Sequence, residues 1–437
     1  MTYEQAKDYL LKRAKELNLE LEVLATESRE LELDSLHERL AKTSISSQGG
    51  IGVRVIIDGK AGYASTEEKN QEALEWVLSE AKENAELQTT SDAFLPQGEN
   101  MGKADLVGEG LSAPIEEKIA AVVGLEHNLR QDSRLKSVAM TRYIESESST
   151  TIASTKNLDG SYRNGYTGVY GVFVMQEGDS IKQSFDIDIS KEFYSLDPTV
   201  TAQKMIKNAA RSLGAKDLKT GKYKAYFEPR AFSQMLGLLQ FMLNGKTVLE
   251  GKSLLADKLG QTVASSLVSI VDDPNLEKGL ASHPFDSEGT KTKAITLIEN
   301  GVLKSFLHNS ATAKETGQAN TGHASRSYKS SLGVSASNFY LKEGSGIKMD
   351  KGIIVTDLMG VHAGVNPISG DFSLQAFGIL VEDGKEQHAV ENFAISGNFI
   401  DLLQNISAIG DKLEWTLYAG IIGTPMVEVS ELSFAGS

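Results

Sequence analysis

The most informative absence in this chain of 437 residues is cysteine, of which there is none. Without a thiol the chain can form no disulfide, thiolate zinc site or iron–sulfur cluster, and it has no cysteine nucleophile. The N-terminal stretch also lacks a basic leader followed by an apolar core and a small-residue cleavage site, so a secretory signal is not expected. Both absences fit a cytoplasmic protein, which is our expectation.

Positive charge and long apolar runs are scarce as well. The 44 Lys and Arg residues stand against 59 Asp and Glu, for a net charge of −15, and no basic cluster with interleaved aromatic residues occurs. Nucleic-acid binding, which depends on neutralising phosphates, is therefore not expected. The longest uncharged apolar run, residues 231–245, is shorter than the roughly 20 apolar residues that span a bilayer. This run, which follows Pro229, indicates a buried helix.

The patterns that are present predict an α+β fold in three regions. Residues 1–105 combine an amphipathic helix, alternating strands and a second helix that opens at Ser65, which forms a capping-box pattern with Glu68. Residues 106–220 repeat the mixture of helix and strand. Residues 221–437 are rich in strands and have few helices, so we expect a β-rich C-terminal domain.

Three hairpins are predicted from turn chemistry. Asp-Gly or Asn-Gly pairs stand between strand-like runs at residues 58–59, 300–301 and 383–384. These pairs favour two-residue turns, because both residues tolerate a positive φ. The glycine-rich stretch SSQGGIGVRV is followed by a strand and not by a helix, so it predicts a turn that enters a strand and argues against a phosphate-binding loop.

Histidines and a glycine-rich loop supply the first candidate functional residues. His283, His308 and His323 lie in one region but lack the spacing that places two rings on one helix face. A metal site and ordinary hydrogen-bonding histidines both remain open for them. Similarly, His362, Asn366 and Asp371 lie in the loop GVHAGVNPISGDFS, where they are candidates for ligand binding or for stabilising a turn.

An acidic stretch supplies the second set of candidates. It contains Asp272, Asp273, Asp286 and Glu288. Paired carboxylates perform general acid–base catalysis or hold magnesium, whereas Asp-Pro and Ser-Glu-Gly sequences also form solvated turns. Both interpretations are open at this point.

Three stretches of the C-terminal half resemble the TldD/PmbA family. They are PFDSEGTKTKAITLIENGVLKSFLHNSATAKETGQANTGHA, GVNPISGDFSLQAFGILVEDGK and ISGNFIDLLQNISAIG. Members of that family have been described as modulators of DNA gyrase and are regarded as metallopeptidase subunits. The resemblance covers essentially the whole chain and is strongest over residues 222–437. It implies a fold with an N-terminal α+β region, a middle region and a β-rich C-terminal domain.

The resemblance also implies where a metal would be held, and this chain departs from the pattern there. In the TldD branch a helix carries His-Glu-x-x-x-His, and a cysteine nearer the C-terminus completes the site. The corresponding window here is QFMLNG, with Gln240, Phe241, Asn244 and Gly245 at or beside the motif positions. It offers no imidazole or carboxylate, and amides suit zinc poorly. The chain therefore resembles the other branch, TldE or PmbA, and is expected to bind no metal itself.

For that branch the family implies a subunit of a peptidase complex. A TldD-like sister subunit would carry zinc or another divalent metal, and the heterodimer would degrade unfolded peptides and mature peptide precursors. Two other functions stay open: an autonomous hydrolase built on the acidic stretch and the histidines, and a homodimeric peptide-binding protein without turnover.

Overall fold

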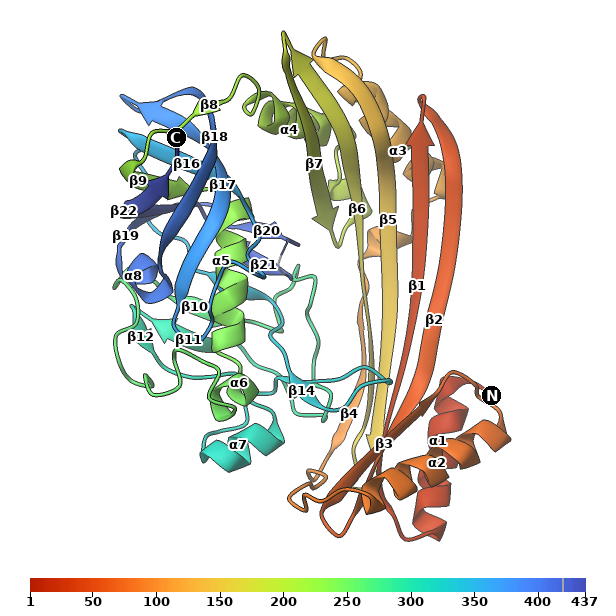
Figure 1. The fold of residues 1–437 in the computed structure, drawn as a ribbon. Coiled ribbons are helices and arrows are strands. Elements are labelled where there is room, and N and C mark those ends of the chain that lie inside the picture. The colour runs from red at the N-terminus through yellow and green to blue at the C-terminus, as the bar shows by residue number, and fades with distance from the viewer. Residues whose placement is uncertain (419) are drawn as a thin grey trace.

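The computed structural model describes residues 1–418 and 420–437, and strands dominate its mixed α+β architecture, as predicted (Figure 1). The helices are α1 (Tyr3–Glu16), α2 (Gln71–Glu86), α3 (Ile115–Leu129), α4 (Pro198–Ala210), α5 (Pro229–Met242), α6 (Gly245–Leu249), α7 (Ser310–Thr316) and α8 (Phe399–Gln404), with 3₁₀ turns at Glu109–Ser112 and Phe193–Ser195.

A seven-stranded sheet forms the N-terminal half, in the order β3-β2-β1-β5-β6-β4, with β7 also pairing with β6. Its strands are β1 (Glu20–Leu36), β2 (Arg39–Ile57), β3 (Lys60–Thr66), β4 (Asn100–Leu106), β5 (Leu135–Ser154), β6 (Asp159–Glu177) and β7 (Ser180–Ser190). Figure 1 shows β1, β2, β5 and β6 as long strands that run side by side along the molecule.

Alternation along β1 explains how this sheet is covered. Leu21 and Val23 pack with α1 and α2, whereas Leu31 and Leu33 pack with α3 and α4. All four have odd numbers, and successive side chains of a strand point to opposite faces. The two helix pairs therefore cover one face of the sheet, one pair at each end. On the other face Leu24 packs against Phe285 of the C-terminal half.

The first two predicted regions share this one sheet. β1 pairs with β2 on one side and with β5 on the other, over Glu22–Ser35 and Thr141–Ser154. β4, which reaches Leu106, pairs with β6. The boundary expected near residue 105 therefore does not separate two sheets, because the strands on either side of it belong to the same hydrogen-bonded ladder.

The C-terminal half is built from two larger sheets and one small one. Their orders are β12-β11-β10-β15-β21-β20, β19-β22-β9-β16-β17-β18-β8 and β13-β14. The strands are β8 (Lys216–Asp217), β9 (Gly221–Phe227), β10 (Ile270–Asp272), β11 (Ile295–Glu299), β12 (Val302–Leu303), β13 (Ala324–Ser325), β14 (Gly333–Val334), β15 (Phe339–Leu341), β16 (Gly352–Met359), β17 (Asp371–Glu382), β18 (Lys385–Asn398), β19 (Ile406–Ile409), β20 (Glu414–Thr416), β21 (Ile422–Thr424) and β22 (Val427–Ala435).

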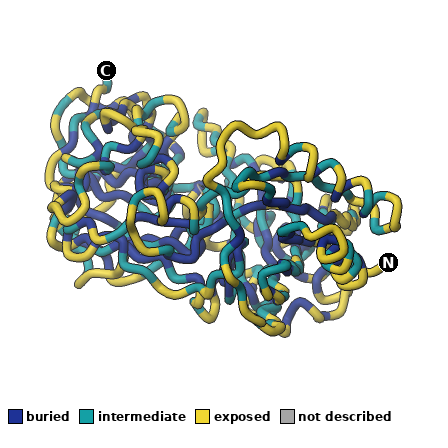
Figure 2. The backbone as a smooth tube through the Cα atoms, turned by 90° about the horizontal axis from the view of Figure 1, so that it is seen from below, coloured by how far each residue is buried: buried dark blue, intermediate teal, exposed yellow. Residues whose placement is uncertain are grey.

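Helix α5 occupies the centre of this half. Pro229 begins it at the first turn, where the missing N–H costs no hydrogen bond. Its apolar side chains, among them Phe232, Leu236 and Leu239, are fully buried in a core shared with both larger sheets. The predicted buried helix is confirmed. Figure 2 shows buried backbone running through both halves of the molecule.

Local turn predictions have mixed outcomes. All three predicted hairpins form, with positive φ at both turn residues of each pair. Helix α2, however, begins after Asn70, whose side chain accepts from the Ala73 N–H, and Ser65 belongs to β3. The glycine-rich stretch is continuous strand within β2 and not a turn, and Tyr328 lies directly against Gly50 and Gly52. No helix within the described ranges is long and apolar enough to cross a membrane.

Candidate functional site

The junction between α5 and α6 holds the residues that correspond to the expected motif window. Helix α5 ends at Met242, and Asn244 then begins α6 as its N-cap. The Asn244 Oδ1 accepts from the Lys246 N–H at 2.9 Å, and its Nδ2 donates to the Val334 carbonyl at 2.8 Å. Gln240 is half-buried and Phe241 is 43% exposed. The oxygen and the nitrogen of the Asn244 side-chain amide are therefore both hydrogen-bonded to backbone groups.

Gly245 is in close contact with a histidine from a distant segment. A β-carbon built on Gly245 would lie 2.4 Å from Nδ1 of His308 and 2.7 Å from the Leu307 carbonyl. His308 is 1% exposed, and its Nδ1 lies 3.1 Å from the Thr312 hydroxyl. Burial lowers the pKa of His308, so the ring is neutral at pH 7. Its imidazole occupies the space that a side chain at position 245 would need.

These contacts decide whether the junction fits a divalent metal. Catalytic zinc sites use imidazole, carboxylate or thiolate donors from three protein residues. The junction presents the Asn244 amide, which is already hydrogen-bonded, the half-buried amide of Gln240 and the apolar ring of Phe241. The donor set does not fit a metal of this kind. Over residues 1–418 and 420–437, moreover, no group of three His, Asp or Glu side chains is arranged to hold a metal ion.

Two of the three candidate histidines lie together in a buried polar cluster. His323 approaches Asp272 at 3.0 Å between Nε2 and Oδ1, and its Nδ1 is 2.9 Å from the Thr321 hydroxyl, which also bonds His308. Asp272 accepts further hydrogen bonds from the N–H and hydroxyl of Ser337. Because Asp272 lies between Ser337 and His323, the histidine does not contact that hydroxyl as a general base would. The cluster ties three segments of the core together.

His283 stands apart from that pair and is half-buried. Its Nδ1 lies 2.8 Å from the Ala281 carbonyl, and its ring stacks on Tyr162. Burial lowers its pKa. The structure thus gives all three histidines hydrogen-bonding roles.

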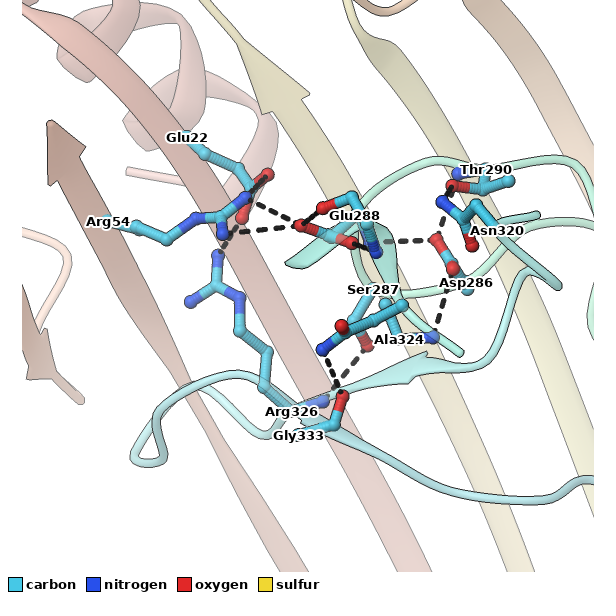
Figure 3. Close-up of polar contacts among 12 residues, drawn as sticks. Glu22, Arg54, Asp286, Ser287, Glu288, Thr290, Asn320, Ala324, Arg326 and Gly333 are labelled. Atoms are coloured by element: carbon cyan, nitrogen blue, oxygen red, sulfur yellow. Dashed lines mark hydrogen bonds and ion pairs between the residues drawn. The ribbon is translucent and has the colours of Figure 1, made fainter. Parts of the chain in front are cut away.

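Asp286, from the acidic stretch, is buried and encircled by backbone amides. It accepts from the N–H groups of Glu288 and Thr290 at 2.9 Å and from that of Ala324 at 3.0 Å (Figure 3). Three such bonds favour the ionised carboxylate. Two effects oppose these hydrogen bonds: burial, which is the larger, and the neighbouring charge of Glu288. Together they raise the pKa of Asp286 to about 7. Asp286 therefore titrates near neutral pH inside a closed turn.

Glu288 joins the acidic stretch to the N-terminal sheet. It lies 3.4 Å from the Arg54 guanidinium and accepts from the N–H of Ser310 at 2.9 Å. Arg54 donates to Glu22 at 2.8 Å, and the other carboxylate oxygen of Glu22 accepts from Arg326 at 2.8 Å. Figure 3 shows the two guanidinium groups converging on Glu22, with Glu288 beyond Arg54. All four side chains are buried.

We call Glu22, Arg54, Glu288 and Arg326 the ionic tie, because they connect β1 and β2 to the C-terminal half. Sequence reasoning found Glu288 alone. A signal for the others existed: Glu22 and Arg54 interrupt the apolar strands LELEVLA and GVRVII, where a charge needs a buried partner. Their partner Arg326 could not be identified, since it lies 304 positions from Glu22.

The loop candidates are separate from these clusters. Asn366 accepts from the backbone of Ile368 and Ser369, and Asp371 accepts from the Ser369 hydroxyl and the Asn398 amide. These contacts lower the pKa of Asp371, with Asn398 as the main cause. His362 is exposed on the same loop. Asn366 and Asp371 thus stabilise the turn that precedes β17.

Known proteins share both the sequence pattern and the fold of this chain. Family models described as PmbA/TldA metallopeptidase match in three parts: domain 1 at residues 21–85, the central domain at 108–213 and the C-terminal domain at 220–436. The chain is 26% identical over 430 residues to a metalloprotease PmbA homolog of Haemophilus influenzae, covering 94% of this chain and 91% of that protein. It is 24% identical over 401 residues to metalloprotease PmbA of Escherichia coli, with 90% and 88% covered.

Solved structures show the same fold. A proposed modulator of a DNA gyrase from Thermotoga maritima superposes with a TM-score of 0.89 at 28% identity, covering 99% of this chain and 100% of that one. TldE from Thermococcus kodakarensis gives a TM-score of 0.88 at 23% identity, again over 99% of this chain and 100% of the other. At that lower identity the likeness concerns the fold alone.

Proposed function

Since this chain belongs to the PmbA/TldD family, we propose that it is a non-catalytic, TldE-like subunit of a cytoplasmic metallopeptidase complex. Its sister would be a TldD-like chain that holds zinc or another divalent metal. The complex would cleave unfolded peptides and mature peptide precursors. The names of the relatives associate the family with metal-dependent proteolysis.

The observation that carries the proposal is the donor set at the α5–α6 junction. A family of metalloproteases needs a metal centre, yet the window that corresponds to the motif offers amides, a phenyl ring and a glycine. His308 fills the space beside Gly245, so a ligand side chain would also meet a steric obstacle there. Hydrolysis by a metal held at this junction is therefore not a reaction that this chain's residues support.

The outer edge of β2 supports a protein partner. β2 pairs with β3 over Ile51–Ile57 only. Among residues 1–418 and 420–437, positions 39–50 therefore have β1 on one side and no strand on the other. Leu40 and Ile45 are 40% and 59% exposed there. A strand with one unpaired edge and exposed apolar side chains is a surface on which another chain can pair. We assign the sister subunit to this edge.

The autonomous hydrolase is less well supported. Its acidic residues are satisfied by protein donors: Asp286 by three backbone amides, and Glu288 by Arg54 and Ser310. His323 is bound to Asp272 within the core. A general base needs hydrogen-bond reach to a substrate proton, and Asp286, Glu288 and His323 are all buried among protein partners.

The test is peptide cleavage by the purified chain, alone and with a TldD-like sister, with zinc and with a chelator. We expect no cleavage by this chain alone, chelator-sensitive cleavage by the mixture, and a stable complex in analytical ultracentrifugation. Ile45→Asp should weaken the complex, whereas Ile181→Asp, an exposed change on β7, should not. Chelator-sensitive cleavage by the chain alone that disappears in His323→Ala or Asp286→Asn would overturn the proposal and favour the hydrolase.

A further inference from the structure

Helix α2 has an acidic outer surface that includes an exposed tryptophan. Its 16 residues contain five Glu and one Lys. Trp76 is 53% exposed, and Glu72 and Glu80 stand one turn before and one turn after it on the same side of the helix. Leu87, the C-cap residue, is 78% exposed and follows on this side about three turns later. Because tryptophan is usually well buried, this surface has the character of a binding face.

A groove of about 740 Å³, which we call the α3–α4 groove, lies between the end of α3 and the side of α4. Its α4 residues recur every three or four positions from Thr199 to Arg211, so they form one stripe along the helix. Ile206 and Ala210 supply apolar surface within that stripe. A groove between two helices, with apolar and polar lining, is a surface that receives a third helix. Its other side is lined by the end of α3 and the turn after it, at Asn128, Gln131, Asp132 and Arg134.

The charge of the groove is opposite to that of α2. Helix α4 contains two Lys and no Asp or Glu. Three lining residues of the groove are cationic, and one, Asp132, is anionic. Asp132 pairs with Arg134 at 2.8 Å, and Glu228 pairs with Arg211 at 2.7 Å. Lys207 is exposed and forms no ion pair with any residue of 1–418 or 420–437, so its charge is available to a carboxylate from another molecule.

The two surfaces do not meet within one chain. α2 and α4 lie at opposite ends of the long N-terminal sheet (Figure 1). The net charge of −15 opposes association between copies in general. A contact between two copies therefore needs a local pair of surfaces with opposite charge. The outer surface of α2 and the α3–α4 groove are such a pair.

We propose that α2 of one copy docks in the α3–α4 groove of a second copy, with the Trp76 ring against Ile206 and glutamates of α2 paired with Lys207. The two surfaces differ, so the contact is heterologous and copies add head to tail. A single helix in a groove buries less surface than a standard interface. We therefore expect a weak contact, with a dissociation constant of roughly 10–100 µM.

This contact is separate from the proposed function. The sister subunit is assigned to residues 39–50 of β2, and neither α2 nor the groove includes any of them. Trp76→Ala should therefore leave sister binding and cleavage by the mixture unchanged. Ile45→Asp, in turn, should leave the head-to-tail contact unchanged. Either proposal can fail while the other stands.

The first experiment is sedimentation equilibrium of the full chain, without a sister, at about 1–200 µM. We expect the average mass to rise beyond that of a dimer, and added NaCl to weaken association because salt screens charge pairs. Trp76→Ala and Lys207→Glu should each weaken association at least about tenfold. Leu267→Ala and Lys348→Glu, two exposed positions in the C-terminal half, are the matched controls and should change nothing. A wild-type chain that stays monomeric would overturn the proposal.

The second experiment mixes the two interface variants. The Trp76→Ala chain keeps its groove and the Lys207→Glu chain keeps its α2, so one intact contact remains between them. We expect the equimolar mixture to associate more strongly than either variant alone and to stop at the dimer. A mixture that associates no more than its two components would show that Trp76 and Lys207 do not belong to one contact, and the proposal would be wrong.

Tryptophan emission tests where Trp76 lies in the assembly. The chain has two tryptophans, so Trp415→Phe leaves Trp76 as the only source of this emission. We expect the emission to shift to the blue as the concentration rises, because the ring leaves water for an apolar surface. Lys207→Glu in the same background should reduce the shift at each concentration. Association without any shift would place the contact elsewhere and exclude the α3–α4 groove as the site of Trp76.

Discussion

At the scale of single residues, the contact between Gly245 and His308 defines the α5–α6 junction. The imidazole is buried, neutral and packed where a β-carbon would project from position 245. Glycine is therefore required there for space and not for its backbone conformation, because Gly245 is not one of the glycines with a positive φ. The histidine takes part in packing and in the hydrogen bond to Thr312.

Gly245→Ala should destabilise the protein by about 1–3 kcal/mol, because the added methyl must displace a buried ring and a carbonyl. The control is Gly124→Ala in α3, where the nearest atom would be 3.8 Å away. Alanine favours a helix, so this variant should gain up to about 1 kcal/mol. Urea unfolding measures both. Equal and small effects would show that His308 can move aside.

Asp286 makes the stability of the folded protein depend on pH. Its pKa is about 7 when folded, against an ordinary value of 3.8. The folded state thus holds the proton more tightly than the unfolded state, and its contribution to stability falls as pH rises from about 4 to 7. The lowered pKa values of His283 and His308 act in the opposite direction below 6.5.

Asp286→Asn isolates this effect, because asparagine does not titrate. We expect the free energy of unfolding of the wild type to fall relative to that of the variant from pH 5 to about pH 7, and the difference to level off above the folded pKa of about 7. Urea unfolding at pH 5, 6, 7 and 8 measures the difference. A constant difference across this range would mean that Asp286 keeps an ordinary pKa.

At the scale of elements, α5 is the helix on which the C-terminal core is assembled. Leu239 is fully buried between the two larger sheets, whereas Phe241, two residues along, is 43% exposed. The same helix therefore offers a buried and an exposed position within one turn.

Leu239→Asp should lower the free energy of unfolding by about 3 kcal/mol or more, since it places an unpaired carboxylate in an apolar core. Phe241→Asp should change it by about 1 kcal/mol or less. Thermal and urea unfolding of the two variants give the comparison. Similar losses in both would indicate that the exposed face of α5 is packed in solution.

The sequence predicted elements better than it predicted their partners. The uncharged run became α5, and the three Gly-containing pairs became hairpins, because each signal is contained in a few neighbouring residues. The pairing of β1 with β5 and of His323 with Asp272, 51 positions apart, has no local signature. Ser65 and Glu68 matched a capping box, but pairing of β3 with β2 holds Ser65 in a strand.

At the scale of the whole molecule, the ionic tie connects the two halves. Glu22 accepts from both Arg54 and Arg326, so one carboxylate holds β2 and the segment after β13 together. Such buried pairs contribute little net stability, but breaking one leaves a charge without a partner. The tie therefore specifies how the N-terminal sheet sits against the C-terminal half.

Arg326→Met should cost roughly 3–5 kcal/mol, because it removes one of the two partners of a buried carboxylate. We expect calorimetry to show one unfolding transition for the wild type and two for the variant, because the halves uncouple. Glu22→Gln in the same chain should recover part of the loss, since the uncompensated charge disappears. Additive losses in the double variant would show that the two side chains do not interact.

The shared N-terminal sheet has a consequence for how the chain is synthesised. Leu21 bonds Thr155, 134 positions later, so β1 leaves the ribosome long before β5 exists to cover its second edge. During that interval β1 and β2 form a long ribbon with an open side, which is the kind of surface on which chains aggregate. Slow translation between residues 60 and 135 would prolong this stage, and a stop codon there would release the ribbon without its partner strand. A nascent chain with this topology therefore passes through a stage at which a chaperone would protect it.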